Sequence, residues 1–178
     1  MDDPPPNTAW SPPPEPVASR PRVPHDYGVP DTDEGLLPWS WAEQRLQATG
    51  TFWFHTTRPD GRPHAMPAWG VWLDRRLWFD GSPETRRMRN LAANPAISVH
   101  LEDGDRALIV EGVAAEAGPP GAELGGRLAA AFTRLFGTRG YSPEPTGWDE
   151  GGLYAVTPRT AFGWESFPAS CTRWRFAG

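Results

Sequence analysis

The chain has 178 residues and a mass of 19.6 kDa, enough for one domain of ordinary size. Its 17 basic residues are all arginine and stand against 22 Asp and Glu residues, which gives a net charge of −5. An acidic chain is poorly suited to bind nucleic acid non-specifically, because such binding needs a basic surface. The single cysteine, Cys171, excludes an internal disulfide and a cysteine-based metal cage.

The chain carries no apolar segment that would direct it to a membrane. It begins with an acidic, proline-rich stretch that does not resemble a signal peptide. No window approaches the roughly 18 consecutive apolar residues that a membrane span requires. We therefore expect a soluble protein of the cytoplasm.

The first part of the chain is dominated by proline. Eleven of the 22 prolines fall within the first 38 residues, with few apolar residues between them. Such a segment cannot bury enough surface to offset the entropy of ordering it. We predict a flexible arm over residues 1–35 and a folded domain over 36–178. An arm of this composition can also dock into an aromatic groove, so a proline-arm adaptor is an alternative.

The folded domain is predicted to begin with a helix from Ser40 to about Ala48, because Ser40 and Glu43 have the spacing of a capping box. Three strands follow, over 51–57, 64–73 and 77–80. Pro67 lies inside the second of them and cannot donate to a neighbouring strand, so it marks an edge or a bulge.

A second helix is predicted to be capped by Ser82, to have Pro83 at its first position and to end at Asn94 and Pro95. Strands over 97–101 and 107–116, a helix over 122–136, and strands over 153–157, 160–167 and 172–176 complete the pattern. Strands joined mostly by short turns, with three inserted helices, indicate an antiparallel α+β domain closed into a small barrel.

The second helix carries the sharpest chemical signal. Arg86, Arg87 and Arg89 lie in its first two turns, where the helix dipole disfavours cations by roughly 0.3–1 kcal/mol each. A bound anion would offset this cost, because backbone N–H groups, the hydroxyls of Ser82 and Thr85, and guanidinium groups all suit a phosphate. A solvated basic face in an arginine-rich chain is the alternative interpretation.

Other kinds of site have little support. The four histidines have no metal-ligand spacing, so we expect no metal site. No nucleophile elbow, dinucleotide-binding loop or P-loop is present. Five tryptophans lie on predicted strands, and a barrel this small cannot bury all of them. Those tryptophans are Trp69, Trp72, Trp78, Trp164 and Trp174.

Several runs of residues resemble the pyridoxamine-phosphate-oxidase-like split β-barrel proteins, and more narrowly their flavin and deazaflavin (coenzyme F-420) oxidoreductases. The resemblance covers about 36–178. It rests on Asp60–Gly70, Leu77–Phe79, Thr85–Pro95 and the C-terminal Thr172–Phe176, with shorter matches at Trp39–Trp41 and Val110–Gly112.

The resemblance implies a homodimer with two cofactor sites between the subunits. It places Met66, Pro67, Ala68 and Trp69 along the ring of FMN or F-420. It also places the following residues around the cofactor phosphate: Ser82, Thr85, Arg86, Arg87 and Arg89. Arg173 and Trp174 are expected to approach the cofactor site of the partner subunit. A backbone that faces a ligand agrees with the proline inside the strand.

The chain ends without the Arg-x-His motif expected of an oxidase that acts on pyridoxamine phosphate. The resemblance therefore implies a different small-molecule substrate. The leading hypothesis is an F-420-dependent reductase of an unsaturated compound, with no catalytic residue named by the sequence. The alternatives are an FMN-dependent oxidase or reductase, and a non-enzymatic carrier or sensor that binds a flavin or haem.

Overall fold

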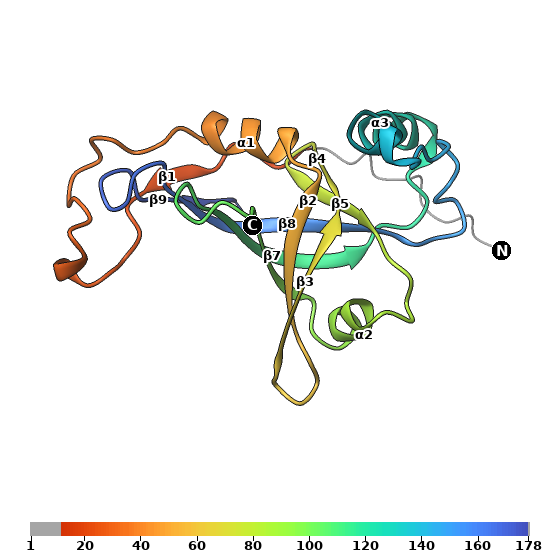
Figure 1. Ribbon diagram of the computed structural model, residues 1–178, viewed down its shortest axis with the longest axis horizontal. Helices are drawn as coiled ribbons and strands as arrows, with labels where there is room; N and C mark the ends of the chain where they lie inside the picture. Colours follow the sequence, from red (N-terminus) through yellow and green to blue (C-terminus); the bar gives the residue numbers. More distant parts are fainter. Residues whose placement is uncertain (1–11, 178) are drawn as a thin grey trace.

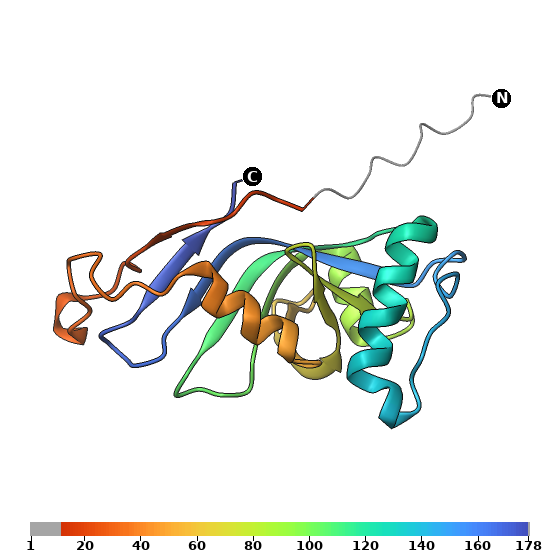
Figure 2. The ribbon, with the colours of Figure 1, turned by 90° about the horizontal axis from the view of Figure 1, so that it is seen from above.

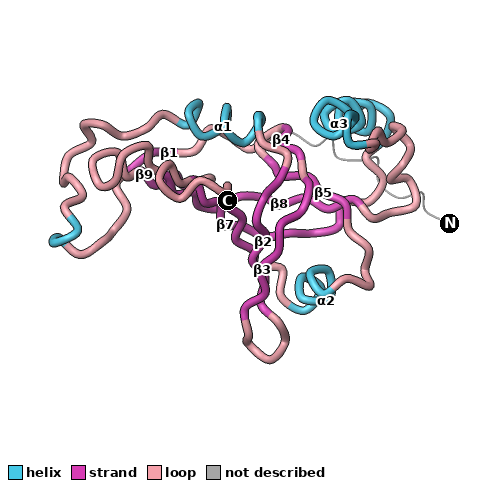
Figure 3. Tube along the Cα trace, in the orientation of Figure 1, coloured by secondary structure: helices cyan, strands magenta, loops and turns pink. Residues whose placement is uncertain are grey.

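The computed structural model describes residues 12–177, which form an antiparallel sheet with helices packed around it (Figures 1 and 3). The strands are β1 (Val17–Ser19), β2 (Thr51–Thr57), β3 (Pro63–Trp69), β4 (Val71–Leu73), β5 (Arg76–Asp80), β6 (Ala96–His100), β7 (Leu108–Glu116), β8 (Leu153–Gly163) and β9 (Thr172–Arg175). The helices are α1 (Trp39–Ala48), α2 (Arg86–Ala93) and α3 (Gly121–Phe136), with short 3₁₀ turns η1 (His25–Tyr27) and η2 (Gly137–Arg139).

The sheet curls because one long strand changes partners. The main path runs β1-β9-β8-β7-β6-β2-β3, and every pairing is antiparallel. The first half of β8 also pairs with β5, while its second half pairs with β9. Since β5 pairs in turn with β4, the sheet folds over on itself and encloses a core. This arrangement confirms the predicted split β-barrel.

The helices seal two apolar clusters. Helix α1 packs Trp39, Ala42 and Leu46 onto the inner side of the barrel, where Trp39 meets the rings of Trp72, Trp174 and Phe176. Helix α3 covers a second cluster on β4, β5 and β8. Helix α2 lies beside the β2–β3 hairpin, away from α1 and α3 (Figure 1). The view from above shows that α1 and α3 are also separate from each other (Figure 2). Within residues 12–177, no helix is both long and apolar enough to cross a membrane.

Helices α1 and α2 do not have the N-terminal caps that the sequence pattern predicts. Helix α1 begins at Trp39 after an extended Pro38, and no side chain caps it, so Ser40 is an exposed helical residue. As the first residue of the helix, Trp39 buries its ring in the core. Helix α2 is capped by Thr85, whose Oγ1 accepts a hydrogen bond from Met88 N–H, and not by Ser82. Ser82 and Pro83 form the turn before the helix.

The predicted strands are mostly confirmed, but their breaks differ. The strand expected over 64–73 divides at Gly70, where any Cβ would lie about 3 Å from Leu77 and from the carbonyl oxygen of Trp78. The two strands expected over 153–157 and 160–167 are one strand, β8. A register shift near Gly112 accommodates Pro158 without breaking the pairing. The structure thus has nine strands among the described residues.

Part of the segment predicted as a flexible arm forms a strand in the structure. Residues 1–11 lie outside the described range. Beyond them, β1 pairs with β9 and extends the sheet by one strand. The Arg20 side chain then donates hydrogen bonds to four backbone carbonyls, two of them at Ala169 and Cys171. Polar contacts of the backbone and one arginine therefore hold a segment that has little apolar surface to bury.

Candidate functional site

Strand β3 presents a free backbone edge. Hydrogen bonds from Gly70 N–H to Gly50 O and from Arg58 N–H to Arg62 O, both 2.9 Å, fix the even-numbered residues as the hydrogen-bonded pairs with β2. The carbonyls of Ala65, Pro67 and Trp69 therefore point away from β2. No other strand among residues 12–177 pairs with β3. The missing N–H of Pro67 falls on this free side, where it disturbs no ladder, as predicted for an edge strand.

The start of α2 lies beside one end of this edge. The Thr85 cap leaves Arg86 and Arg87 as the first two helical residues. Arg86 is exposed to solvent, whereas the side chain of Arg87 turns beneath the helix. The helix N-terminus and the two guanidinium groups together make this end of the β3 edge strongly positive.

Arg87 is the most unusual residue of the site, because its charged side chain is only 6% exposed. Its guanidinium lies 4.9 Å from the centre of the Phe54 ring and 5.0 Å from that of Phe79. Nη2 donates a 3.0 Å hydrogen bond to the carbonyl oxygen of Asp80. Nε and Nη1 are buried without a hydrogen-bond partner among the described residues, and burial lowers the pKa of the side chain. A buried guanidinium with two open donor groups is suited to receive an anion.

A chain of polar side chains links α2 to both strands of the hairpin. Asn90, which is fully buried, donates a 2.9 Å hydrogen bond from Nδ2 to Thr56 Oγ1. Thr56 Oγ1 in turn lies 3.4 Å from Nδ1 of His64 on β3. The Oδ1 atom of Asn90 has no partner among residues 12–177. These contacts fix the position of α2 against the strand that carries the free edge.

The other end of the β3 edge meets an aromatic group. The Trp69 ring, whose residue is 38% exposed, stacks on Phe136 of α3 at a centroid distance of 4.5 Å. Tyr141 lies 5.9 Å from Trp69, and the guanidinium of Arg139 lies 6.0 Å above its ring. The free edge therefore runs from a basic cluster near His64 to an aromatic group at Trp69, about 17 Å at roughly 3.4 Å per residue.

Asp80 connects the two ends. Its carboxylate accepts hydrogen bonds from Tyr141 Oη and, at 2.7 Å, from Trp148 Nε1. Its carbonyl oxygen holds Arg87. Burial and the hydrogen bond to Asp80 raise the pKa of Tyr141 above its ordinary value, so its phenol stays a donor.

Among the other residues expected at the site, the structure brings some together and separates others. Met66 and Ala68 face the same side of β3 as His64, because alternate residues of a strand share a face. Ser82 and Thr85 are exposed in the turn that leads into α2. Arg89 instead lines a groove of about 350 Å³ between α2, β7 and Tyr154.

The C-terminal pair does not reach the free edge of its own chain. Trp174 is 0% exposed and belongs to the core, where its indole N–H donates a hydrogen bond to Leu37 O. The Trp174 side chain thus has no accessible surface in the structure, and its approach to the partner's cofactor stays a prediction. Arg173 lies on the opposite face of the sheet and donates hydrogen bonds to Ser19 Oγ.

The outer face of the sheet is half-buried and rich in aromatic residues. The cross-strand register places one row of side chains on it: Pro67, Trp53, His100, Ile109, Phe162 and Arg173. A groove of about 520 Å³ opens on this face beside His55, His100 and Trp164. His55 and His100 stack at 4.8 Å, and burial together with His100 lowers the pKa of His55.

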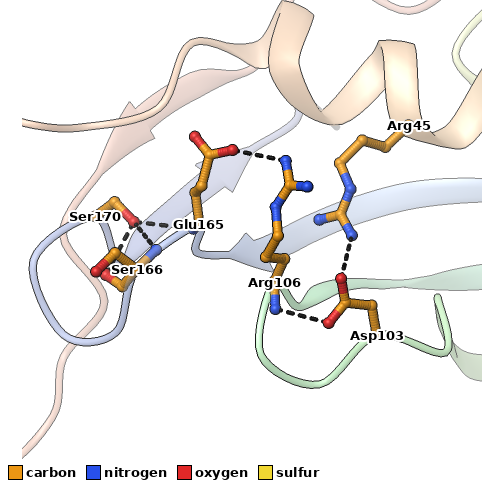
Figure 4. A network of polar contacts seen from close by, with 6 residues as sticks. All are labelled: Arg45, Asp103, Arg106, Glu165, Ser166 and Ser170. Carbon is orange, nitrogen blue, oxygen red and sulfur yellow. Dashed lines mark hydrogen bonds and ion pairs between the residues drawn. The ribbon is translucent and has the colours of Figure 1, made fainter.

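Asp103, which lines this groove, belongs to a network of polar side chains. Arg106 donates to Glu165 at 2.6 Å, and Arg45 lies 3.8 Å from the carboxylate of Asp103 (Figure 4). Ser170 Oγ accepts hydrogen bonds from the N–H groups of Glu165 and Ser166 (Figure 4). These contacts fix the turn between β6 and β7 against the loop that follows β8.

Reasoning from sequence missed His64 as a member of the basic cluster, which also includes Arg58. Burial and the charges of Arg58, Arg86 and Arg87 lower the pKa of His64, which brings all four side chains into one electrostatic environment. A signal was available: the turn centred on Asp60 pairs Thr56 with His64, and His64 shares a face with Met66. Arg62 is engaged elsewhere, since it forms an ion pair with Asp60 at 2.8 Å.

Comparisons with known proteins agree with this geometry. A family model described as pyridoxamine 5'-phosphate oxidase matches residues 41–147. A solved structure of a conserved hypothetical protein from Mycobacterium tuberculosis is 21% identical, with a TM-score of 0.60, and the match covers 76% of this chain and 89% of that one. A structure named F-420 reductase is 25% identical, with a TM-score of 0.52 and coverage of 73% and 98%.

Other solved neighbours have different printed roles. A heme-binding protein from Mycobacterium smegmatis is 19% identical, with a TM-score of 0.55 and coverage of 75% of this chain and 57% of that one. The search of curated proteins found no match. Because the family model spans more than half of the chain and the fold agrees, the chain belongs to the pyridoxamine 5'-phosphate oxidase-like family of split β-barrel proteins.

Proposed function

We propose that this protein binds a flavin-type cofactor along the free edge of β3 and acts as an oxidoreductase on a small molecule. The observation that carries this proposal is the buried guanidinium of Arg87, whose open Nε and Nη1 groups lie beside an unpaired strand edge. The leading cofactor is coenzyme F-420, and FMN is the alternative.

The residues present fit the phosphate of such a cofactor. Arg87 offers two buried donors without partners, and Arg86 adds an exposed guanidinium. Thr85 and Ser82 stand at the N-terminal end of α2, where the helix dipole favours negative charge. In this proposal these four residues hold the phosphate.

The residues also fit a flat ring. The free carbonyls of Ala65, Pro67 and Trp69 are acceptors, and the free N–H groups of Ala65 and Trp69 are donors. The polar edge of an isoalloxazine or deazaflavin ring presents complementary groups. Met66 and Ala68 then line the site by side chains, and Trp69 closes its far end with Phe136.

The protein's part in the reaction is to bind, orient and exclude water. A flavin or deazaflavin supplies hydride chemistry when bound, and the family relies on the cofactor for this step. The aromatic group at Trp69, Phe136 and Tyr141 covers the ring end of the edge. The chain's own contribution is therefore positional, and we assign it no acid–base residue.

Two considerations favour F-420 and a substrate other than pyridoxamine phosphate. The solved F-420 reductase is 25% identical to this chain, whereas a solved structure described as a putative pyridoxamine 5'-phosphate oxidase is 14% identical. The C-terminal strand β9 carries Arg173, Trp174 and Arg175, with Trp174 buried, and has no Arg-x-His pair. An unsaturated, electron-poor small molecule is the proposed substrate.

We also propose a homodimer formed through the outer face of the sheet. The row that contains Trp53, Ile109 and Phe162 is half-buried and apolar, a composition typical of subunit interfaces. Measured along the sheet, Arg173 lies five strands from Pro67, roughly 24 Å away at about 4.8 Å per strand. In this proposal Arg173 serves the partner's site, because it lies far from the free edge of its own chain.

Fluorescence titration of the purified protein with F-420 and with FMN tests the proposed function. Micromolar or tighter binding of F-420 alone supports the reductase, and a preference for FMN moves the protein to the flavin branch. Binding without turnover of any acceptor points to a carrier. Binding of neither compound, with the protein shown to be folded by circular dichroism, overturns the proposal.

A further inference from the structure

His64 stands where the charges of three elements converge. It lies on β3, two residues before Met66, and its Nδ1 contacts Thr56 Oγ1 on β2 at 3.4 Å. Asn90 of α2 donates to the same hydroxyl at 2.9 Å. These neutral contacts hold the imidazole in place and leave Nε2 for a further partner.

The charged side chains that act on the pKa of His64 are all cations. Arg58 follows β2, and Arg86 and Arg87 come from the first turn of α2. None of these three arginines forms an ion pair within residues 12–177. The neighbouring carboxylate, that of Asp60, is held by Arg62, although Arg58 also lowers its pKa.

The cluster therefore has positive charge and open donors in excess. Nε and Nη1 of Arg87 and Nε of Arg58 are buried without partners among the described residues. Burial and the three arginines lower the pKa of His64 below its ordinary value, so the imidazole is neutral in the free protein near pH 7. A bound anion would raise the pKa of His64, because its attraction for the imidazolium opposes the repulsion from the three arginines.

We propose that His64, with Arg58, is a ligand of the cofactor phosphate and takes up one proton as the phosphate binds. The inference rests on the proposed function and deepens it in two ways. It adds two residues to the phosphate site, and it makes cofactor affinity depend on pH through a named side chain. The proton comes from the solvent and resides on the imidazole while the phosphate is bound.

The direction of the pH effect follows from linkage. The His64 pKa is low in the free protein and higher in the complex. Affinity gained from the imidazolium is therefore fully present below the free-state pKa and is lost as the pH rises through the bound-state pKa. Each unit of difference between the two pKa values changes affinity by about tenfold over that range.

The first experiment compares the wild type with His64→Gln from about pH 5.5 to pH 8.5. FMN and F-420 are the probes, and His25→Gln, in the exposed turn η1, is the matched control. Protonation of the ligand itself affects every protein equally, so the ratio of dissociation constants isolates His64. We expect His64→Gln to bind several-fold to tenfold more weakly at low pH and about equally at high pH, with no such trend in His25→Gln.

The second experiment measures the His64 titration directly by nuclear magnetic resonance, with the resonance assigned by its absence in His64→Gln. FMN at saturation should move this pKa upward by about a unit or more. An unchanged pKa, or a flat affinity ratio with cofactor bound, overturns the inference and leaves the proposed function standing. If neither protein binds FMN or F-420 at any pH, both fail together.

Discussion

Asp80 and Arg87 are joined by a 3.0 Å hydrogen bond from Arg87 Nη2 to the Asp80 carbonyl oxygen. The carboxylate of the same Asp80 anchors Tyr141 and Trp148 from the loop after α3. One residue at the end of β5 thus positions the buried guanidinium and also fixes the loop next to the aromatic end of the site. The phosphate end and the ring end of the proposed site are mechanically connected through it.

Replacing Arg87 by methionine should separate binding from stability. Methionine keeps contact with the Phe54 and Phe79 rings and removes a buried charge with two unpartnered donors, so the free protein should keep its melting temperature or gain a few degrees. Cofactor affinity should fall by roughly 1.5–3 kcal/mol, the scale of a hydrogen bond to a charged group.

The measurement is thermal unfolding with and without saturating FMN, together with fluorescence titration. Arg127→Ala is the matched control, because this α3 residue pairs with Asp74 away from the site. If Arg87→Met binds the cofactor as tightly as the wild type does, the phosphate does not bind at this position.

Replacing Arg58 by glutamine should raise the pKa of His64 in the free protein. Arg58 is the first of the three cations that depress this pKa, after burial itself, so removing its charge makes the imidazolium easier to form. Nuclear magnetic resonance titration of His64 measures the shift directly. Arg134→Gln on α3, which donates to the carbonyl of Gln47, should leave that pKa where it is. A downward or absent shift in Arg58→Gln would take Arg58 out of the cluster.

Part of this site was predictable from local sequence. The arginines of α2, the threonine and serine before it, and a proline in an edge strand are signals carried within a few residues of one another. The sequence pattern predicts strand 51–57 with the bounds that the structure has, because its aromatic and β-branched residues alternate between buried and open faces.

Other parts depend on contacts between distant residues and were missed. The direction of the Arg87 side chain is set by Phe54, Phe79 and Asp80, which come from two other strands. Tryptophan is a residue type that can stack on a ring ligand, but Trp174 is buried by its packing against Trp39. The pairing of β1 with β9 joins segments more than 150 residues apart, and a three-residue strand among prolines gives no periodic signal.

Removing the hydroxyl of Tyr141 should reduce stability at neutral pH. Tyr141→Phe deletes the hydrogen bond to the Asp80 carboxylate, and we expect a loss of about 1.5–3 kcal/mol in the free energy of unfolding. The raised pKa of Tyr141 adds a pH dependence: stability is fully present below about pH 10, the unfolded-state pKa, and is lost as pH rises above it.

Denaturant unfolding between pH 8 and about pH 11 checks both statements. The stability gap between wild type and Tyr141→Phe should narrow at the alkaline end. Tyr154, whose pKa is also raised, contributes equally to both proteins. Tyr27→Phe, at an exposed position in η1, is the control and should show no gap. A gap that stays constant with pH would mean that the phenol does not titrate as described.

Arg20 should matter more than its half-buried position near the end of the chain indicates. It donates to the carbonyls of Thr32, Glu34, Ala169 and Cys171, and so it ties the segment around β1 to the loop before β9. Arg20→Ala should lower the free energy of unfolding by about 1–3 kcal/mol. Deletion of residues 1–35 should lower the melting temperature as well, because it also uncovers the edge of β9. Arg22→Ala, two residues along, should be within about 0.5 kcal/mol of the wild type; equal effects of the two variants would contradict the role given to Arg20.

A charge at Ile109 should dissociate the proposed dimer. Ile109 lies in the middle of the outer-face row, beside His100 and Phe162, so Ile109→Glu would bury a carboxylate in the interface. We expect the dimer dissociation constant to rise by at least about tenfold, or 1.4 kcal/mol, in sedimentation equilibrium. Ala130→Glu, on the exposed side of α3, is the matched control.

If Arg173 serves the partner's site, the monomeric variant should also bind cofactor more weakly, and Arg173→Ala should reproduce that loss while remaining a dimer. A wild-type protein that sediments as a monomer with cofactor bound would contradict both the interface and the shared site.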